Sequence, residues 1–334
     1  MIRVGLVGIG GMGRVHFGCH NNNPDVRLAA ICDVDDRKLA GDWSTIGLNV
    51  DTSKSGQVDL SALKTYKDYH DLAADPDIDM IDVCTPTPFH APVAIAGLQG
   101  GKHVLCEKPM AVTSDECGAM SRAARESGKQ LMIAHCLRFW PHYQKAHDLM
   151  QSGEYGKVLY ARFHRSSATP RWSWHDWMRT PSMSGGCVLD MHIHDADTAL
   201  WWFGKPATIE ADGLILNALP LTVDATWRYE NGPVAHLYGN WDHNGGQFKM
   251  AYEVVMERAT VSWDSSVGST VHLYIDEKLT EITVSDTSGY QNEIDYFIDC
   301  ISTGKPVETV TPEGSRTTVE HALEETRQIR AKGR

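Results

Sequence analysis

The sequence has no apolar run of the ~18–20 residues that a membrane-spanning helix requires. Its first ten residues, MIRVGLVGIG, lack the basic region, long apolar stretch and small-residue cleavage site of a signal peptide. We therefore expect no membrane partner and a cytoplasmic location. The formal net charge of −12 argues against a nucleic-acid partner, because phosphate contacts need a basic face.

Paired cysteine motifs are also missing. The eight cysteines stand at positions 19, 32, 84, 106, 117, 136, 187 and 300, with no C-x-x-C among them. Several lie within apolar runs, such as Cys84 in MIDVCTP, so we expect most to be buried free thiols of a reducing compartment. Repeats and low-complexity segments are absent as well. The length of 334 residues and the apolar fraction of 42% predict a globular chain of two domains.

What is present begins with a dinucleotide-binding pattern. RVGLVGIGGMGRVH predicts a strand, a turn and a helix start, and Gly8, Gly10 and Gly13 fit G-x-G-x-x-G. The first glycine permits the tight turn, the second lets backbone approach a pyrophosphate, and the third lets helix pack on strand. The helix N-terminus then favours phosphates. The residues expected to bind the cofactor here are Gly8, Ile9, Gly10, Gly11, Met12 and Gly13.

A second predicted strand, VRLAAICD, ends at Asp33, where a Rossmann unit places its ribose-binding carboxylate. A carboxylate there accepts hydrogen bonds from the ribose hydroxyls of NAD and repels the 2′-phosphate of NADP. Asp35 and Asp36 add to the repulsion, whereas Arg37 and Lys38 soften it. We therefore favour NAD over NADP as the cofactor.

The rest of the first domain alternates as a doubly wound parallel sheet should. DIDMIDVCTP and KHVLCEKP predict buried strands, and APVAIAGLQGG predicts the helix between them. Ligands of such sheets lie beyond the carboxyl ends of the strands. The residues that emerge at this edge, and that we expect near the cofactor, are Thr85, Pro86, His90, Glu107 and Lys108.

A helix with clear end signals closes the first domain. It begins with a capping box formed by Thr113 and Glu116 and stops at Gly128. We place the NAD-binding Rossmann domain at residues 1–122 and a substrate-binding and oligomerisation domain at residues 123–334.

The pattern then changes from alternating strands and helices to consecutive strands. After a strand over 130–139 and a helix over 141–152, eight segments rich in Val, Ile, Thr, Tyr and Trp predict strands. They span 157–166, 207–216, 221–230, 233–241, 249–257, 259–264, 270–276 and 279–285. Short turns predict a mostly antiparallel sheet. Helices over 291–303 and 313–330 complete an α+β domain.

The stretch DMHIHDAD puts two histidines and three aspartates into a segment of helical pattern, residues 186–204. On a regular helix Asp190, His194 and Asp197 share a face, while His192 points about 200° away from His194. Helical metal ligands stand four residues apart, and Asp190 with His194 has no clear third partner, so we expect no metal. A surface Asp–His pair is the alternative that the residues alone leave open.

GIGGMG, CTPTPFH and CEKPMA, in this order, resemble the glucose–fructose oxidoreductase and inositol dehydrogenase family (Gfo/Idh/MocA). The resemblance covers essentially the whole chain and implies a Rossmann domain followed by an α+β domain with a large open sheet. In that family the open face commonly makes subunit contacts, so we expect a homodimer or homotetramer. It also implies that Lys108 reaches the reacting carbon, while Glu107 and the Thr85–Pro86 backbone line the nicotinamide end.

The same family carries a Gly-Gly pair followed by an Asp, a His and an Asp at fixed spacing. The matching residues of GGCVLDMHIHDAD are Gly185, Gly186, Asp190, His194 and Asp197. The resemblance implies His194 as acid–base residue, Asp190 as its orienting partner and Asp197 as substrate ligand. The chemistry agrees, because a base with the ordinary histidine pKa of ~6.5 suits removal of a hydroxyl proton. Lys108 would stabilise the developing alkoxide.

The preceding segment, RWSWHDWMRTPSMSGG, is unusually aromatic. Indole rings commonly stack on sugars, although an aromatic minicore or a subunit contact explains any single Trp equally well. Trp177 is the preferred substrate contact, because the family often has a tryptophan there, and Arg138 is expected to face the nicotinamide or the substrate. Weaker candidates, with core or interface as their default, are His164, Arg165, Trp241 and His243.

These features predict an NAD-dependent dehydrogenase or reductase. It would oxidise a secondary hydroxyl of a sugar, sugar derivative or cyclitol by hydride transfer to nicotinamide. One alternative is an NAD-dependent glycosidase of the same fold that uses transient oxidation. The other is a catalytically silent NAD(H)-binding sensor, whose signature would be the loss of Lys108 or His194, and both residues are present.

Overall fold

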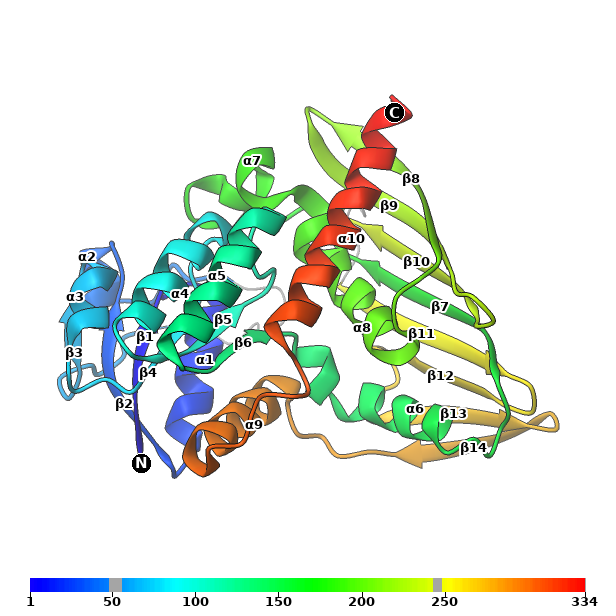
Figure 1. Cartoon of the computed structure of the whole chain (residues 1–334), viewed down its shortest axis with the longest axis horizontal. Helices are drawn as coiled ribbons and strands as arrows, with labels where there is room; N and C mark the ends of the chain where they lie inside the picture. Colours follow the sequence, from blue (N-terminus) through cyan, green and yellow to red (C-terminus); the bar gives the residue numbers. More distant parts are fainter. Residues whose placement is uncertain (48–55, 243–247, 334) are drawn as a thin grey trace. The chain divides into compact units, whose positions relative to one another are not determined.

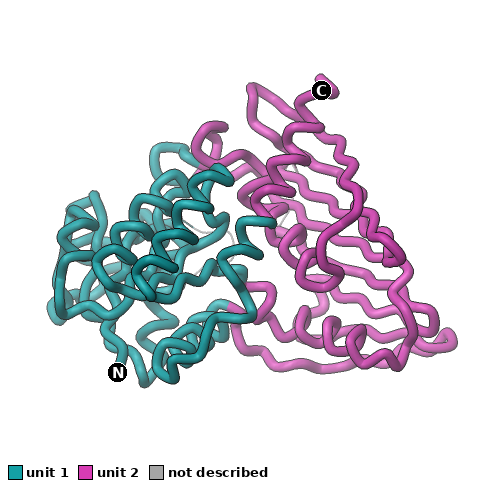
Figure 2. Tube along the Cα trace, in the orientation of Figure 1, with its two compact units in different colours: residues 1–135, 172–177, 290–317 teal, residues 136–171, 178–289, 318–334 magenta. Residues whose placement is uncertain are grey.

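The computed structural model of the chain describes residues 1–47, 56–242 and 248–333. They form two compact units, and the chain passes between them several times (Figure 2). The first unit holds Met1–His135, Trp172–Trp177 and Tyr290–Thr317, and the second holds Cys136–Arg171, Met178–Gly289 and Thr318–Arg334. None of the described helices is long and apolar enough to cross a membrane.

A parallel sheet with the strand order β3-β2-β1-β4-β5-β6 forms the centre of the first unit (Figure 1). Its strands are β1 (Ile2–Val7), β2 (Val26–Cys32), β3 (Lys64–Tyr66), β4 (Met80–Val83), β5 (His103–Glu107) and β6 (Leu131–Ala134). All four residues of β4 are buried, as expected for an inner strand covered on both faces. The order reverses between β1 and β4, and such sheets bind ligands beyond the carboxyl ends at this point.

The first unit also contains helices, and several of them connect these strands. They are α1 (Gly11–Asn22), α2 (Asp36–Leu39), α3 (Tyr69–Ala74), α4 (His90–Gln99), α5 (Ser114–Ser127) and α9 (Gly289–Thr303), with the 3-10 turns η1 (Thr87–Phe89) and η3 (Trp174–Arg179). The capping box of α5 is confirmed, because Thr113 Oγ1 accepts the Glu116 N–H and the Glu116 carboxylate accepts the Thr113 N–H. The helix ends at Gly128, which has a left-handed φ of 66°.

The predicted domain boundary after residue 122 can be compared with the two compact units. It falls inside α5, and β6 still pairs with β5 in the parallel sheet, so the first unit continues to His135. The chain also returns to this unit at residues 172–177 and 290–317. One boundary in the sequence cannot describe a unit built from several separate segments, because such a unit arises from packing between distant parts of the chain.

A mixed sheet with the order β14-β13-β12-β11-β7-β10-β9-β8 forms the second unit. Its strands are β7 (Val158–Ser166), β8 (Thr208–Leu216), β9 (Leu219–Arg228), β10 (Val234–Asn240), β11 (Lys249–Met256), β12 (Thr260–Asp264), β13 (Thr270–Ile275) and β14 (Lys278–Thr283). They confirm the predicted strand segments. Strands β7 and β10 run parallel and the other neighbours antiparallel, so the mostly antiparallel sheet is also confirmed.

The second unit also contains helices. They are η2 (Cys136–Phe139), α6 (Pro141–Gln151), α7 (Pro181–Ser184), the π turn η4 (Val188–His192), α8 (Ile193–Phe203) and α10 (Pro312–Ala331). Figure 1 shows α8 and α10 on the same side of the strands, and α6 packs against β12 and β13. Residues of β10 alternate between buried and half-buried, as a sheet packed on one face requires. The predicted strand over 130–139 stops at Ala134, where η2 follows.

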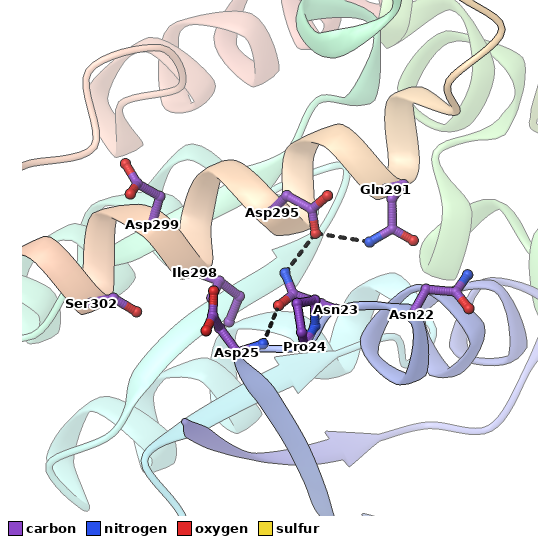
Figure 3. Close-up of a pocket in the computed structure, with 9 residues that line it drawn as sticks. All are labelled: Asn22, Asn23, Pro24, Asp25, Gln291, Asp295, Ile298, Asp299 and Ser302. Atoms are coloured by element: carbon purple, nitrogen blue, oxygen red, sulfur yellow. Dashed lines mark hydrogen bonds between the residues drawn. The ribbon is translucent and has the colours of Figure 1, made fainter.

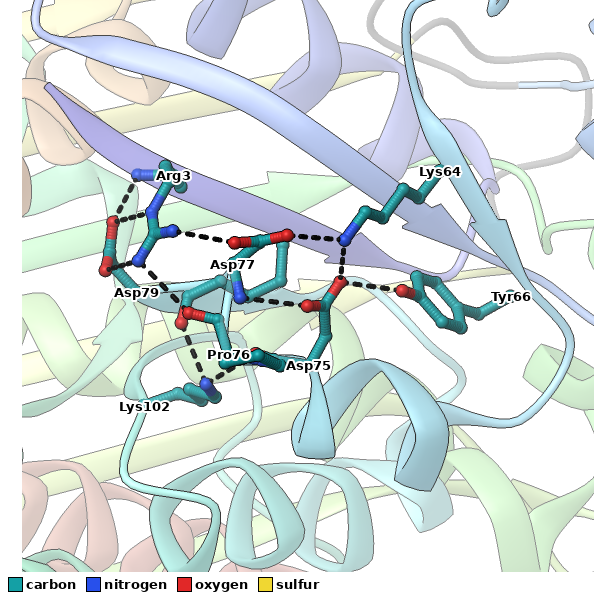
Figure 4. Close-up of polar contacts among 9 residues, drawn as sticks. Arg3, Lys64, Tyr66, Asp75, Pro76, Asp77, Asp79 and Lys102 are labelled. Atoms are coloured by element: carbon teal, nitrogen blue, oxygen red, sulfur yellow. Dashed lines mark hydrogen bonds and ion pairs between the residues drawn. The ribbon is translucent and has the colours of Figure 1, made fainter.

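Ion pairs join the segments at the amino-terminal edge of the first sheet (Figure 4). Arg3 on β1 donates from Nε and Nη2 to Asp79, at 2.9 and 2.8 Å. Lys64 on β3 lies 2.8 Å from carboxylate oxygens of both Asp75 and Asp77. The hydrogen bond from Lys64 lowers the pKa of Asp75. These charged groups are used for mutual contacts, whereas the predicted cofactor residues emerge at the opposite edge.

Candidate active site

The glycine turn between β1 and α1 keeps open the space that a pyrophosphate would approach. Gly8 has a φ of 93°, and a Cβ on it would lie 2.7 Å from the carbonyl oxygen of Cys84. A Cβ on Gly13 would collide with the Gly8 carbonyl. A Cβ on Gly10 would meet no described atom within 4 Å. Packing therefore requires Gly8 and Gly13, while Gly10 leaves the turn accessible, as a Rossmann turn needs.

Helix α1 begins directly after this turn. Its N-cap is Gly10, and no side chain in the described part of the chain caps the helix there. The N–H groups of the first turn, which include those of Gly11 and Met12, can therefore bind an anion with the help of the helix dipole. The turn and helix start fit the pyrophosphate of a dinucleotide.

Asp33 follows β2, and backbone N–H groups hold its carboxylate in place. Its Oδ2 accepts the Ile9 N–H at 2.8 Å and its Oδ1 accepts the Asp35 N–H at 2.9 Å. The ammonium of Lys38 lies 3.3 Å from Oδ2, whereas Arg37 pairs with Asp35. The bond to Ile9 joins Asp33 to the glycine turn, so the structure brings these two predicted cofactor elements together.

His90 lies at the predicted edge of the sheet, and its ring contacts the backbone there. It is buried, with Nδ1 2.7 Å from the Pro109 carbonyl oxygen and Nε2 2.9 Å from the Thr85 carbonyl oxygen. Both ring nitrogens therefore lie against backbone carbonyls, which fixes the ring, and the contact of His90 with the cofactor stays a prediction. The ring ties the half-buried Thr85 and Pro86, after β4, to the turn after β5.

Glu107 and Lys108 stand at the carboxyl end of β5. Glu107 is buried, and its Oε2 accepts the backbone N–H of Lys108 at 3.0 Å. The side chain of Lys108 is half-buried. The backbone at Lys108 is thus held between the Glu107 carboxylate and the His90 contact at Pro109, while its side chain retains access to the outside.

Sequence reasoning missed a buried polar cluster below this edge. His16 and His20 on α1 both contact the Asp82 carboxylate on β4, at 2.9 and 2.7 Å. His16 Nε2 also lies 3.2 Å from Glu107 Oε1. The sequence contained two signals, since Asp82 interrupts an apolar strand and the histidines are four residues apart on one helix.

In the second unit, the predicted helix over 186–204 is present with one irregular turn. Residues Val188–His192 form a π turn, and α8 continues to Phe203. A π turn is wider than an α-helical one, so a rotation of 100° per residue does not hold for Asp190. Such turns are frequent at functional sites.

Three buried ion pairs hold this helix. They join His192 Nε2 to Glu325 at 2.9 Å, Asp195 to Arg165 at 2.9 Å and Asp197 to Arg138 at 2.8 Å. Burial lowers the pKa of His192, but the Glu325 carboxylate more than compensates, so that the pKa is raised. These contacts give His192 and Asp195 structural roles.

Asp197 and Arg138 were predicted to contact substrate and cofactor, but they contact each other. Arg138 donates from Nε and Nη2 to the two carboxylate oxygens of Asp197, each at 2.8 Å. The Thr318 hydroxyl adds a bond of 3.2 Å, and Asp197 is 1% exposed. Bidentate pairs of this kind are strong and geometrically specific. Asp197 and Arg138 therefore form a structural ion pair, and their predicted contacts with substrate and cofactor stay predictions.

Asp190 and His194 are the remaining predicted catalytic residues of the helix. Asp190 is buried at 7% exposure, and His194 is half-buried. His192 is 0% exposed. Of the two histidines, His194 is therefore the accessible one, and a base must reach the proton that it removes.

Part of the aromatic segment, Trp174–Arg179, forms the 3-10 turn η3. His175 and Asp176 within it have left-handed φ values of 46° and 58°, which is uncommon outside glycine. Trp172 and Trp174 are 39% and 41% exposed, while the preferred Trp177 is half-buried. Parts of Trp172 and Trp174 are therefore exposed, and the Trp174 ring contacts the ring of His175.

The weaker candidates divide between core and surface. Arg165 and Trp241 are buried, and Arg165 holds Asp195, so both belong to the core. The ring of His164 is half-buried against Tyr238, with ring centroids 5.2 Å apart. His243 lies outside the described residues.

A polar pocket elsewhere in the first unit is lined by Asn22, Asn23, Pro24, Asp25, Gln291, Asp295, Ile298, Asp299 and Ser302 (Figure 3). It lies where α1 ends and β2 begins, away from the glycine turn at the start of α1. Asp295 accepts bonds from Asn23 and Gln291, at 2.6 and 2.8 Å. Its carboxylates do not suit an anionic pyrophosphate.

The fold and glycine turn of the first unit define a dinucleotide-binding protein of the Rossmann class. Comparison with known families extends this to an enzyme class. Residues 2–135 match the oxidoreductase family with an NAD-binding Rossmann fold, and residues 143–262 match the GFO/IDH/MocA C-terminal domain. The chain belongs to the Gfo/Idh/MocA family of oxidoreductases.

Known relatives agree with this assignment. The chain is 29% identical to an oxidoreductase of Bacillus subtilis over 280 residues, which are 81% of this chain and 76% of the relative. It is 30% identical to myo-inositol 2-dehydrogenase of Thermotoga maritima over 217 residues, which are 64% of this chain and 59% of the relative. The aldose-aldose oxidoreductase of Caulobacter crescentus shares the fold, with a TM-score of 0.83 at 21% identity over 100% of this chain and 98% of that one.

Proposed function

We propose that the chain is an NAD-dependent dehydrogenase that oxidises a secondary hydroxyl of a sugar, sugar derivative or cyclitol. The observation that carries this proposal is the position of Lys108 directly after β5. Lys108 is partly exposed there, at the ligand-binding edge of an NAD-binding fold. Its backbone is fixed by the Glu107 carboxylate and by the contact of His90 with the Pro109 carbonyl. The similarity to a myo-inositol 2-dehydrogenase supports a polyol substrate.

NAD is the proposed cofactor in preference to NADP. The residues that would hold it are the glycine turn, Asp33, Thr85 and Pro86. Asp33 presents a carboxylate beside the Ile9 N–H, which favours ribose hydroxyls over a 2′-phosphate. Lys38 reduces this preference but does not reverse it, because its ammonium is itself paired with Asp33. Bound NAD supplies a hydride acceptor at the nicotinamide ring.

His194 is the proposed acid–base residue. It takes the hydroxyl proton of the substrate during oxidation and returns it during reduction. Asp190 orients the imidazole and stabilises its charged form. Lys108 carries a fixed positive charge that stabilises the oxygen as negative charge develops on it. Trp177 is proposed to contact the substrate ring.

We also propose a homodimer or homotetramer assembled through the sheet face opposite α8. That face carries rings at partial exposure, in the pairs Tyr160 with His236 and His164 with Tyr238. Aromatic residues are enriched in interfaces.

The test of the proposed function is absorbance at 340 nm across a panel of sugars, sugar derivatives and inositols. NAD and NADP are each supplied with every alcohol, and NADH with the corresponding ketones. We expect continuous turnover with at least one polyol and a preference for NAD. A chain that binds NADH, measured by fluorescence, but turns over no alcohol or ketone would instead be a sensor.

A further inference from the structure

Helix α1 carries a buried imidazole that contacts two carboxylates. His16 is 0% exposed, with Nδ1 2.9 Å from Asp82 Oδ2 and Nε2 3.2 Å from Glu107 Oε1. The first contact is a hydrogen bond. The second has ion-pair distance without hydrogen-bond alignment. The two carboxylates belong to adjacent strands, β4 and β5.

One of these carboxylates, that of Glu107, also contacts the backbone of the proposed catalytic residue Lys108. Glu107 presents Oε1 to His16 and Oε2 to the backbone N–H of Lys108. A continuous series of contacts thus runs from Asp82 through His16 and Glu107 to the backbone of Lys108. His16 is the only imidazole among the described residues whose ion-pair contacts reach both Asp82 and Glu107.

The surroundings of His16 favour its charged form. Burial lowers its pKa, but the Asp82 carboxylate, with further contributions from Cys84, raises it well above the ordinary value. The same pairing keeps the pKa of Asp82 low in spite of burial. The other titratable groups near His16 are His20 and Cys19 on the same helix, Glu107 on β5 and Glu293 on α9.

Burial disfavours a third negative charge, on Glu293, beside those of Asp82 and Glu107. Glu293 is 0% exposed, and both its carboxylate oxygens have no hydrogen-bond partner among the described residues. Burial raises its pKa well above the ordinary value, against a smaller opposing effect of His16. A neutral Glu293 leaves Asp82 and Glu107 as the carboxylates that His16 balances.

We propose that His16 is a positioning residue, an imidazolium that holds the Glu107 carboxylate where it fixes the Lys108 backbone. The part of this inference that concerns turnover rests on the proposed role of Lys108. A cationic ring restrains Glu107 on the side opposite Lys108, so the carboxylate cannot rotate away from the Lys108 N–H without losing an ion pair in a buried site.

The same residues also raise the question of a metal. Donor atoms of His16, Asp82 and Cys84 lie within 4.8 Å of one another. A metal ligand must offer a deprotonated nitrogen, but both His16 nitrogens lie against carboxylates, and burial raises the pKa of Cys84. The contacts fit an ion pair better than a metal centre.

The test compares His16→Gln with His20→Gln. His20 is a matched control, because it is buried on the same helix and bonded to the same Asp82 oxygen, and its ion-pair contact is with Asp82 alone. We expect His16→Gln to lower kcat by roughly 10- to 100-fold through misplacement of Lys108, with little change in KM or in NAD binding. His20→Gln should retain most of its turnover. Equal losses in the two variants would overturn the proposal.

A double-mutant cycle tests whether His16 acts through Glu107. Glu107→Gln keeps an oxygen that can accept the Lys108 N–H but removes the charge. If His16 works by holding Glu107, the double variant should be little worse than either single variant. Independent, multiplicative losses would contradict the mechanism.

A measurement without turnover separates this inference from the proposed function. In the wild-type protein labelled with ¹⁵N-histidine, both His16 ring nitrogens should show imidazolium shifts at about pH 7.5, above the ordinary histidine value of ~6.5. The signal is assigned by its loss in His16→Gln. A neutral ring, or a stoichiometric metal in elemental analysis of the purified chain, would overturn the inference even if the enzyme oxidises a polyol. If the ring is charged and no polyol reacts, the proposed function fails and the charge state stands.

The stability of the folded protein should depend on pH in a way that reflects the charge on His16. Because the folded-state pKa of His16 is raised, its contribution to stability is complete below ~6.5 and is lost as pH rises through the raised value. The melting temperature of His16→Gln should therefore lie furthest below that of wild type at about pH 6, and the gap should narrow by about pH 9. A gap that widens with pH would contradict the charged ring.

Discussion

Asp33 is the residue that we expect to set cofactor preference. Its carboxylate is fixed by the N–H groups of Ile9 and Asp35, so removal of the charge leaves the turn itself in place. Asp33→Ser should weaken selectivity for NAD, because the repulsion of a 2′-phosphate is lost and Lys38 is released from its pair. The ratio of kcat/KM for NAD to that for NADP measures the effect. A wild-type enzyme that already prefers NADP would contradict this account of β2.

Lys108 is the residue on which the proposed chemistry depends most. Its backbone N–H bonds to Glu107, so truncation of the side chain leaves the turn after β5 supported. Lys108→Ala should lower turnover by roughly 10²- to 10³-fold, the loss typical for a group that stabilises a developing oxyanion. NAD binding, followed by fluorescence titration, should remain. An active Lys108→Ala enzyme would remove the proposed mechanism.

The helix formed by η4 and α8 separates two histidines with different roles. His192 is buried and paired with Glu325, whereas His194 is half-buried. His194→Ala should lose roughly 10²- to 10⁴-fold in turnover, the contribution of a general base, with little loss of stability. Asp190→Asn should fall between His194→Ala and wild type, because the base is kept and its orienting charge is lost.

His192→Ala should show the opposite pattern. Removal of His192 leaves the buried Glu325 with the hydrogen bond from Trp227 but without its ionic partner, which costs about 3–5 kcal/mol of stability. The folded fraction should keep most of its activity. Denaturation curves measured beside initial rates separate the two effects, and EDTA should change neither. Loss of activity in His192→Ala without loss of stability would exchange the roles of the two histidines.

Elements with a strong periodic signal could be predicted from the sequence, whereas the partners of individual side chains could not. The capping box of α5 and the eight strands of the second sheet follow local patterns and lie where expected. Asp197 and Arg138 are 59 residues apart in sequence. Their pairing is created by tertiary packing, so the spacing of polar residues on the predicted helix does not reveal it. The π turn at Val188–His192 has no periodic signature of its own.

In the candidate site, too, local motifs could be predicted from the sequence and side-chain partners could not. The glycine turn and the Glu107–Lys108 motif are contiguous in sequence and could be identified there. His90 also stood at the expected edge, but its ring turned to backbone carbonyls, a contact that no spacing rule specifies. His16 required the packing of α1 on β4 and β5 to reveal its partners.

At the scale of the whole molecule, the account predicts an assembly of identical chains. Light scattering coupled to size exclusion should give two or four times the chain mass of 37.0 kDa. Replacing Tyr160 and Tyr238, which lie on the proposed sheet interface, by Lys should shift the enzyme toward the monomer, because like charges repel across a symmetric contact. A wild-type chain that is monomeric at assay concentration would exclude this interface.

The central claim, net oxidation of a polyol by NAD, is tested most directly by stoichiometry. Purified enzyme is incubated with excess NAD and the best alcohol of the panel, and both NADH and the ketone are quantified in one sample. The account predicts many molecules of NADH per enzyme chain and one ketone per NADH. At most one NADH per chain, with the cofactor returned unchanged while a glycosidic bond is cleaved, would contradict a dehydrogenase and indicate transient oxidation.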